Sequence, residues 1–267
     1  NGTNIRFDYN ATAYLTTSAF NVPFMCYISY NLNTSTLQFY YNGTLASNIT
    51  SVASATLSYS SGYGLFGQNS GTTGAYATNG QIAEYVGYSY PLGSFQQQQI
   101  EGYLAWKWGL QSKLPSTHPF YNNPTIPNFP VLTTSVVSAL TSNFYFQPTS
   151  IAGCALWLDS ADPTTVIQSG GSVTQWNDKS GNGRNAVSSG GVYVNPVYGS
   201  VSWNNTPIIS FNDPTSQMQI SNFVISTQSR SVFFVYQVPG GYTASRYVTL
   251  LTRFAGGAQS LNIGPPT

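Results

Sequence analysis

The sequence contains very little charge. Only 6% of its 267 residues are Asp, Glu, Lys or Arg, whereas an average soluble domain has about 25%. The eight basic and seven acidic residues give a formal net charge of +1, and the basic ones form no cluster. Because binding to a phosphate backbone needs clustered Lys and Arg, we expect no interaction with nucleic acid.

Long apolar runs are also missing. No run approaches the ~20 residues that a membrane-spanning helix needs. The first residues show no basic stretch followed by a hydrophobic one, as a signal segment would. We therefore expect no membrane insertion, and no signal segment is visible.

Cysteine and histidine are scarce. Cys26 and Cys154 lie far apart, so they cannot form a CxxC motif or a four-ligand zinc site. We expect two buried free thiols, with a single disulfide as the alternative. His118 is the single histidine and no Gly-x-Ser-x-Gly motif occurs, so we predict no Ser-His-Asp triad. We interpret His118 as a structural or exposed imidazole.

Neutral polar residues and aromatics dominate what is present, and they predict an all-β protein. Short hydroxyl and amide side chains favour turns and strands over helices. Asn42-Gly43 is a two-residue hairpin signal, because both residues tolerate a positive φ. In the strand expected over 80–88, alternation places Ile82, Glu84 and Val86 on one face, so that one face of this strand is expected to be polar. The other strands are expected over residues 25–30, 37–41, 64–67, 155–158 and 231–236.

One helix is predicted near residues 95–108. Ser94 and Gln97 have the spacing of a capping box, and Gly109 is a natural terminator. Residues that recur at helical intervals form its apolar stripe: Ile100, Tyr103, Leu104 and Trp108. After the helix, prolines are frequent up to Pro130, which indicates an extended linker over 121–150.

Several motifs resemble those of laminin-G-like domains, which have a concanavalin-A-like fold. The Phe-Tyr-Tyr-Asn-Gly run at 39–43 resembles their hairpin, and Gly-Gln-Ile-Ala-Glu at 80–84 resembles a later strand. The helix with its Trp-Lys-Trp at 106–108, and Leu-Pro-Ser-Thr-His-Pro-Phe at 114–120, resemble the closing part of such modules in large DNA viruses and phages. The segments at 155–159 and 173–183 are similar to the opening strands.

The order of these motifs implies a domain organisation. Closing features come first and opening features last, so the resemblance implies the C-terminal part of one laminin-G-like sandwich at 1–120. A Pro-rich linker at 121–150 and the N-terminal part of a second sandwich at 151–267 follow. A single sandwich assembled from both halves is the alternative. The implied fold is an antiparallel β-sandwich of the jelly-roll type.

Candidate catalytic and metal sites are few. A glycosidase needs two carboxylates about 5–9.5 Å apart, but only Asp159 and Asp162 are close in sequence, and Asp162-Pro163 is typical of a turn start. Asp178 and Asn182 echo the first half of a calcium loop, yet the twelfth position is Ser189 instead of Glu. We expect a turn held by side-chain bonds to the backbone, with calcium as the minor alternative and no other cofactor.

Two further groups of residues are candidates for contact with glycans. Tyrosines could stack on sugar rings, although most are expected in the core: Tyr40, Tyr41, Tyr63, Tyr76, Tyr88 and Tyr90. The tryptophans Trp106, Trp108, Trp157 and Trp176 are expected to be packing anchors. Sequons permit N-glycosylation only if the chain enters a secretory lumen; they lie at Asn1, Asn10, Asn33, Asn42, Asn48 and Asn204.

The sequence therefore predicts a non-catalytic protein of a virion surface or capsid, or otherwise an extracellular one. Its expected partners are other coat or surface proteins in a larger assembly, contacted through protein-protein interfaces. A carbohydrate-binding lectin or adhesin that attaches to host glycans is the alternative, and a glycoside hydrolase ranks third.

Overall fold

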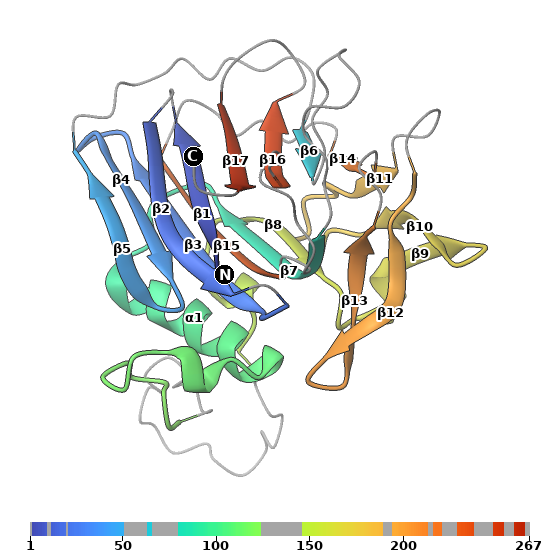
Figure 1. Ribbon diagram of the computed structural model, residues 1–267, viewed down its shortest axis with the longest axis horizontal. Helices are drawn as coiled ribbons and strands as arrows, with labels where there is room; N and C mark the ends of the chain where they lie inside the picture. The colour runs from blue at the N-terminus through green and yellow to red at the C-terminus, as the bar shows by residue number, and fades with distance from the viewer. Residues whose placement is uncertain are drawn as a thin grey trace, which may run out of the picture.

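Strands are the main regular secondary structure of the part of the chain that the structure describes. The computed structural model describes residues 2–9, 12–19, 21–50, 63–65, 80–123, 146–188, 194–212, 216–220, 229–237, 248–253 and 259–264. Its strands pair antiparallel and form two layers, with one α-helix packed on the outside (Figure 1). The predicted all-β antiparallel sandwich is confirmed.

The first sheet contains most of the strands that the sequence predicted. From its edge inward it consists of β5 (Thr44–Ile49), β4 (Thr36–Tyr41), β3 (Phe24–Asn31), β15 (Arg230–Gln237) and β7 (Gly80–Tyr88). The other edge of β7 pairs with both β8 (Cys154–Asp159) and β13 (Thr206–Phe211), and β13 pairs with β12 (Val197–Trp203).

The second sheet covers one face of the first and runs across Figure 1 from β2 to β11. Its strands pair in the order β2 (Thr12–Ala19), β1 (Gly2–Tyr9), β17 (Gln259–Gly264), β16 (Val248–Arg253), β6 (Tyr63–Leu65), β14 (Met218–Ile220), β11 (Ala186–Ser188), β10 (Ser172–Trp176) and β9 (Val166–Ser169). A single residue pair, Ser172 with Val197, joins β10 to β12 and so connects the two sheets.

Strands from both halves of the chain share these sheets. β15 lies between β3 and β7, and β7 pairs with β8 and β13. The described strands of the two expected modules therefore form one sandwich in space, as the alternative with both halves in one sandwich requires. The assignment of 1–120 and 151–267 to the end and the start of two modules stays a prediction about the sequence. Residues 124–145, most of the expected linker, lie outside the described residues.

Local sequence explains the hairpin between β4 and β5. Asn42 and Gly43 have φ values of 47° and 76°, which this two-residue turn requires and which Asn and Gly adopt most easily. The Asn42 side chain also accepts a hydrogen bond from the backbone N–H of Met25 at 2.9 Å. The predicted hairpin is confirmed.

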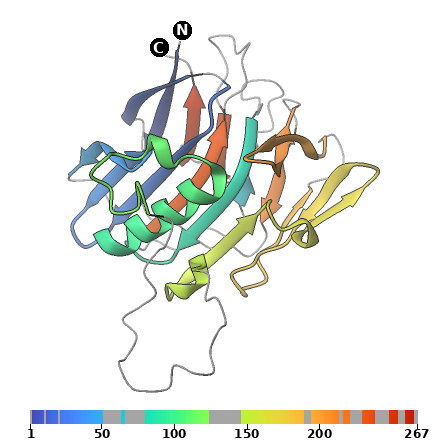
Figure 2. The same ribbon diagram turned by 90° about the horizontal axis from the view of Figure 1, so that it is seen from below.

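The helix α1 (Ser94–Trp108) matches the predicted span and lies across the outer face of the first sheet (Figure 2). Its start differs in detail from the prediction: Gly93 is the N-cap, and its N–H donates to Oε1 of Gln96 at 3.2 Å. The expected Ser94–Gln97 capping box is therefore wrong by one residue. The helix ends at Gly109 in the left-handed conformation, as predicted. It is too short and too polar to cross a membrane.

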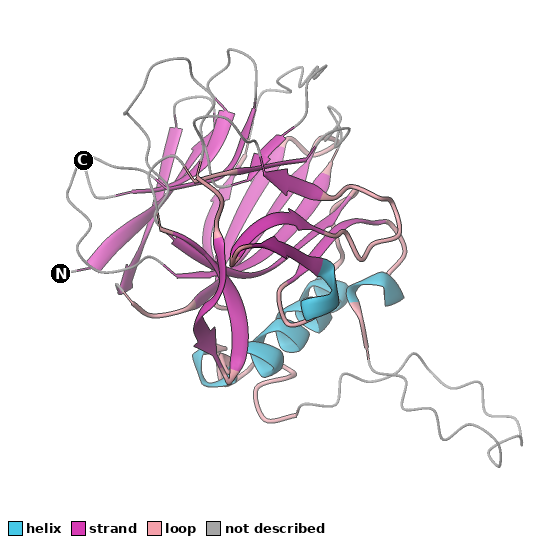
Figure 3. Cartoon of the chain, turned by 90° about the vertical axis from the view of Figure 1, so that its right-hand side faces the viewer, coloured by secondary structure: helices cyan, strands magenta, loops and turns pink. Residues whose placement is uncertain are grey.

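Two hydrophobic cores lie on the two faces of the first sheet. The first, which we call the sandwich core, lies between the sheets and includes Cys26, Tyr85, Trp176 and Phe234. The second, the helix-side core, lies between the first sheet and α1 and includes Leu104, Trp108, Trp157 and Phe233. Figure 3 shows the helical segments gathered on one side of the strands.

Candidate functional site

A β-bulge in β7 decides which layer receives the one acidic side chain of that strand. Val235 pairs with Glu84 but Tyr236 pairs with Ile82, so Ala83 is an extra residue without a partner on β15. Ile82 and Tyr85 face the sandwich core, while Ala83 lies in the helix-side core. A bulge redirects side chains in this way, and Glu84 consequently faces α1. Glu84 and Val86 share the helix side, as the alternation predicted, but Ile82 does not. All nine residues of β7 are buried, so neither face of this strand is exposed to solvent.

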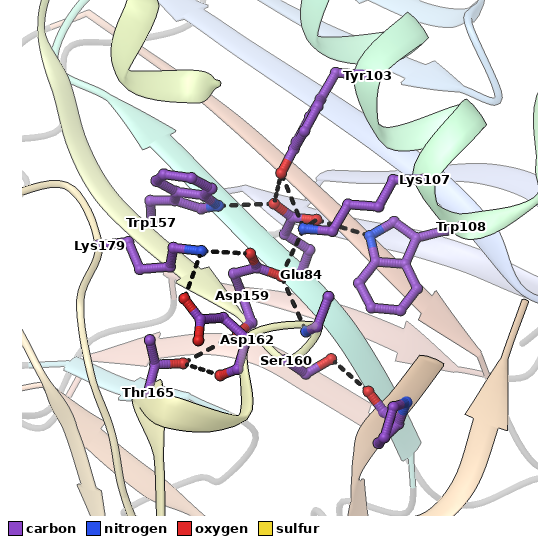
Figure 4. Close-up of polar contacts among 12 residues, drawn as sticks. Glu84, Tyr103, Lys107, Trp108, Trp157, Asp159, Ser160, Asp162, Thr165 and Lys179 are labelled. Atoms are coloured by element: carbon purple, nitrogen blue, oxygen red, sulfur yellow. Dashed lines mark hydrogen bonds and ion pairs between the residues drawn. The ribbon is translucent and has the colours of Figure 1, made fainter. Parts of the chain in front are cut away.

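Glu84 is fully buried, and the protein surrounds its carboxylate with donors (Figure 4). Its Oε1 accepts hydrogen bonds from the Tyr103 hydroxyl at 2.8 Å and from Nε1 of Trp157 at 2.7 Å. Its Oε2 accepts from Nε1 of Trp108 at 2.7 Å and lies 2.8 Å from Nζ of Lys107. The two indole N–H groups can only donate, so they stabilise the ionised form.

Lys107 joins Glu84 to Asp159, its partner across β7 and β8. These two acidic residues lie directly opposite each other in the strand register, so their side chains share the helix face. Nζ of Lys107 lies 2.6 Å from Oδ1 of Asp159 and donates to the Tyr103 hydroxyl at 2.9 Å. One ammonium group, with three donors, thus meets three acceptors on helix and sheet.

Lys179 extends the arrangement to the turn after β8. Its Nζ lies 2.8 Å from Oδ2 of Asp159 and 3.0 Å from Oδ2 of Asp162, above the ring of Trp157. Asp162 accepts hydrogen bonds from both the N–H and the hydroxyl of Thr164, which confirms its predicted role at a turn start. We call Glu84, Lys107, Asp159, Asp162 and Lys179 the charged cluster.

The local environment shifts the pKa values of three of these groups. Burial raises the pKa of Glu84; the nearby Lys107 opposes this rise and Asp159 adds to it. Burial disfavours the charged form of Lys179, but hydrogen bonds and charges from Asp159 and Asp162 together raise its pKa. The Thr164 hydrogen bond, followed by that of Lys179, lowers the pKa of Asp162.

The charged cluster is therefore saturated with internal partners. A glycosidase carboxylate must reach a substrate, whereas Glu84 has no exposed surface and Asp159 almost none. Across the described residues, no three His, Cys, Asp or Glu side chains are grouped to hold a metal ion. The arrangement can tie helix, sheet and turn together and can exchange protons internally.

The segment that echoes a calcium loop bonds to the protein backbone. Oδ1 of Asp178 accepts from the N–H groups of Trp157 and Ser180, and its Oδ2 accepts from the N–H of Arg184. Nδ2 of Asn182 donates to the Cys154 carbonyl at 3.1 Å. These bonds are those of the turn that the sequence favoured, and calcium at Asp178 and Asn182 stays a prediction.

The imidazole of His118 belongs to a second buried polar contact on α1. Its Nδ1 accepts from the N–H of Phe120, so its Nε2 carries the proton and donates to Oε2 of Glu101 at 3.2 Å. Nε2 of Gln97 donates to the other oxygen of Glu101. Phe120 packs on Gly102, where a Cβ atom would come within 2.6 Å of its ring. His118 is thus structural, the first of the two readings expected for it.

The sequon asparagines differ in accessibility. Asn33 and Asn48 are exposed, and Asn42 is half-buried. Asn204 is exposed, but its Nδ2, the atom that a glycan would modify, donates to the Lys107 carbonyl at 3.0 Å. Asn1 and Asn10 lie outside the described residues, and glycosylation at any of these positions stays a prediction.

The aromatic candidates for sugar stacking differ in accessibility. Tyr88 is buried, while Tyr40, Tyr41 and Tyr90 are half-buried. The side chains of Tyr63 and Tyr76 lie outside the described part. Trp108, Trp157 and Trp176 are buried packing anchors as expected, and Trp106 is half-buried. Cys26 and Cys154 are both free, as predicted, but only Cys26 is buried, and the expected burial of Cys154 is wrong because its side chain is half-buried.

Sequence reasoning missed the charged cluster. It considered Asp159 only as a neighbour of Asp162 in the sequence, and the tryptophans as packing residues. The available signal was Glu84 itself, an acid inside an apolar strand in a chain with few charges, because buried acids need partners. Tyr103 and Lys107, one helical turn apart, were the matching donors.

No protein-family model, curated protein or solved structure matches this chain.

Proposed function

We propose that this protein is a non-catalytic structural component of a virion surface or capsid, which acts through contacts with other proteins. The observation that carries the proposal is the distribution of charge. Among the side chains that the structure describes, Lys113 is the one exposed charged residue. The others are half-buried or buried, several of them within the charged cluster.

The exposed positions of the well-described strands are neutral. This holds for exposed residues on β5, β9 and β12: Thr44, Leu45, Ala46, Asn48, Ile167, Gln168, Ser169, Gly199, Ser200 and Ser202. Transfer of a charged group from water into an interface is costly unless it is paired, and interface centres are depleted of charge. A neutral surface of this kind supports broad contacts between proteins. The resemblance to laminin-G-like modules of viruses and phages supports a virion as their setting.

Sedimentation velocity at increasing protein concentration tests the proposal, with a second copy of the chain as the partner. We expect concentration-dependent association. The Asn48→Lys and Ala46→Lys variants on β5 place charge on a neutral strand and should weaken it. Ser112→Lys is the matched control, because it adds the same charge beside the exposed Lys113.

A glycan array with the same protein separates the structural proposal from the lectin alternative. We expect no binding to any sugar. A protein that stays monomeric at high concentration and binds a defined glycan would replace the structural proposal with the lectin.

A further inference from the structure

The contact between Lys107 and Asp159 brings an amine and a carboxyl group together inside the protein. Their nearest atoms, Nζ and Oδ1, lie 2.6 Å apart. The Asp159 side chain is 4% exposed and the Lys107 side chain 20%. The two residues come from different elements, α1 and β8, and are separated by 52 positions in the chain. A bond between them would be a long-range cross-link.

We propose that Lys107 and Asp159 condense into an intramolecular amide bond, with Glu84 as the residue that carries the protons. The reaction goes beyond the proposed structural function, because it does not depend on any partner. It needs no external oxidant, reductant or activating group. An ammonium and a carboxylate are converted into an amide and one molecule of water.

The proton transfers follow the contacts of the charged cluster. Oε2 of Glu84 lies 2.8 Å from Nζ of Lys107, so it can accept a proton and leave a neutral amine. The Nζ–Cγ bond to Asp159 then forms, and the Cγ–Oδ1 bond breaks. Two of the three ammonium protons pass through Glu84 to Oδ1, which leaves as water. The third stays on the amide nitrogen, and Glu84 returns to its starting state.

Other donors prepare the Asp159 carboxyl group for attack. Lys179 donates to Oδ2 at 2.8 Å, where negative charge develops in the tetrahedral intermediate. Stabilisation of such charge by donors already in position is a large source of catalysis. The N–H of Ala161 donates to Oδ1 at 3.0 Å, the oxygen that leaves. The carboxyl carbon is thus polarised by contacts to both of its oxygens.

The surroundings favour the neutral product. Nζ of Lys107 lies over the rings of Tyr103 and Trp108, and Trp157 bonds to Glu84 beside it. Burial raises the pKa of Glu84, which helps it to hold a proton during the transfer. A buried ion pair carries a desolvation penalty for both charges, and amide formation removes both. The new N–H can donate to Glu84, and the remaining Oδ2 still accepts from Lys179.

The structure also selects between the two lysines that contact Asp159. Lys179 lies 2.8 Å from Oδ2, but its other acidic partner is Asp162, whose side chain is 32% exposed and whose pKa is lowered. Asp162 is therefore a poor proton acceptor. Only Lys107 has the buried Glu84 beside it, so the amide is assigned to Lys107 and Lys179 is the donor that stabilises the intermediate.

Intact-mass spectrometry of the purified, denatured chain tests the proposal. We expect the mass to be lower than the sequence mass by one water, and a protease digest to contain a branched peptide that joins Lys107 to Asp159. Asp159→Asn gives a distinct signature, because the same amide would then form with loss of ammonia. Lys107→Arg and Glu84→Gln should have the full sequence mass.

The controls keep the result interpretable. Lys179→Arg retains a cation at Oδ2 and should still lose one water. Circular dichroism shows whether the Glu84→Gln variant folds; if it does not, Lys107→Arg and Asp159→Asn carry the test alone. A wild-type chain with the full sequence mass after prolonged incubation, or a branched peptide at Lys179, would overturn the assignment.

Discussion

The two faces of the first sheet bury different kinds of side chain. The same strands, β3, β7, β8 and β15, line the sandwich core on one face and the helix-side core on the other. The sandwich core is closed by a second sheet and is lined by apolar side chains. The helix-side core is closed by α1 and also encloses Glu84 and Asp159.

The difference between the two cores follows from the hydrogen-bond donors that the covering helix and the covering sheet each supply. A helix presents side chains one turn apart on one face, so Tyr103, Lys107 and Trp108 together can meet one carboxylate. In the sandwich core, by contrast, the Tyr85 hydroxyl and Nε1 of Trp176 are buried and have no hydrogen-bond partner among the residues that the structure describes. The buried acidic groups therefore lie on the helix side of the sheet, where donors exist. The bulge at Ala83 lies directly before Glu84 on that side.

Removal of the Glu84 carboxylate should have the largest effect on the helix-side core. In Glu84→Ala, two indole N–H groups and the Tyr103 hydroxyl lose their acceptor. We expect a loss of about 3–5 kcal/mol in the free energy of unfolding, as for other broken buried pairs. Urea denaturation in a Lys107→Arg background, which cannot form the amide, measures it. A loss below about 1 kcal/mol would show that the charged cluster does not hold α1 to the sheet.

Loss of the Tyr103 hydroxyl in the helix-side core should lower the free energy of unfolding by less than loss of the Glu84 carboxylate. In Tyr103→Phe, made in the same Lys107→Arg background, Glu84 loses one of its donors. We expect a destabilisation of about 1–2 kcal/mol, measured by the same urea titration. An unchanged unfolding midpoint would mean that the remaining donors to Glu84 compensate fully.

The matching change in the sandwich core, removal of the Tyr85 hydroxyl, should raise the free energy of unfolding instead of lowering it. Burial raises the pKa of Tyr85, and no described residue forms a hydrogen bond with its hydroxyl. Tyr85→Phe removes an unpaired buried polar group, so we expect a stabilisation of up to about 1 kcal/mol. Tyr103→Phe is the matched control. A loss of stability similar to that of Tyr103→Phe would contradict the difference between the two layers.

The smallest effect is expected at the exposed end of the charged cluster. Because the pKa of Asp162 is lowered below its ordinary value of 3.8, its ionised form stabilises the fold above pH 3.8, and this contribution is lost as the pH falls through the lower folded value. The Asp162→Asn variant has no ionised carboxylate at this position and therefore lacks this contribution to stability. At neutral pH the variant should be less stable by under about 1 kcal/mol, since solvent screens this pair. The difference in stability between the wild type and Asp162→Asn should shrink well below pH 3.8. A difference that grows as the pH falls would contradict the expected pH dependence.

The sequence predicted the elements of the fold better than their faces. β7 and α1 were expected with nearly their observed bounds, because an apolar pattern and the terminator Gly109 are local signals. Alternation placed Glu84 with Val86, as observed, but it also placed Ile82 with them, and the extra residue Ala83 turns Ile82 to the opposite face. That bulge is visible only in the pairing with β15, which lies about 150 positions further along the chain.

The candidate site was harder to predict for the same reason. Asp159 and Asp162 were recognised as neighbours in sequence, but Lys107 and Glu84 reach Asp159 only through the packing of α1 on the sheet. The calcium-like loop illustrates the opposite case. There, Asp178 and its turn are local, so the expected bonds to nearby backbone groups are present.

The missing side chain at Gly102 has a consequence for the whole helix. Since Phe120 occupies that space, the segment after α1 folds back over it, and His118 reaches Glu101. Gln97, Gln99 and Glu101 are buried along with the apolar residues of α1, and Glu101 bonds to both Gln97 and His118. This part of the helix therefore presents its polar groups to protein partners instead of water, whereas Phe95 in its first turn remains exposed to solvent.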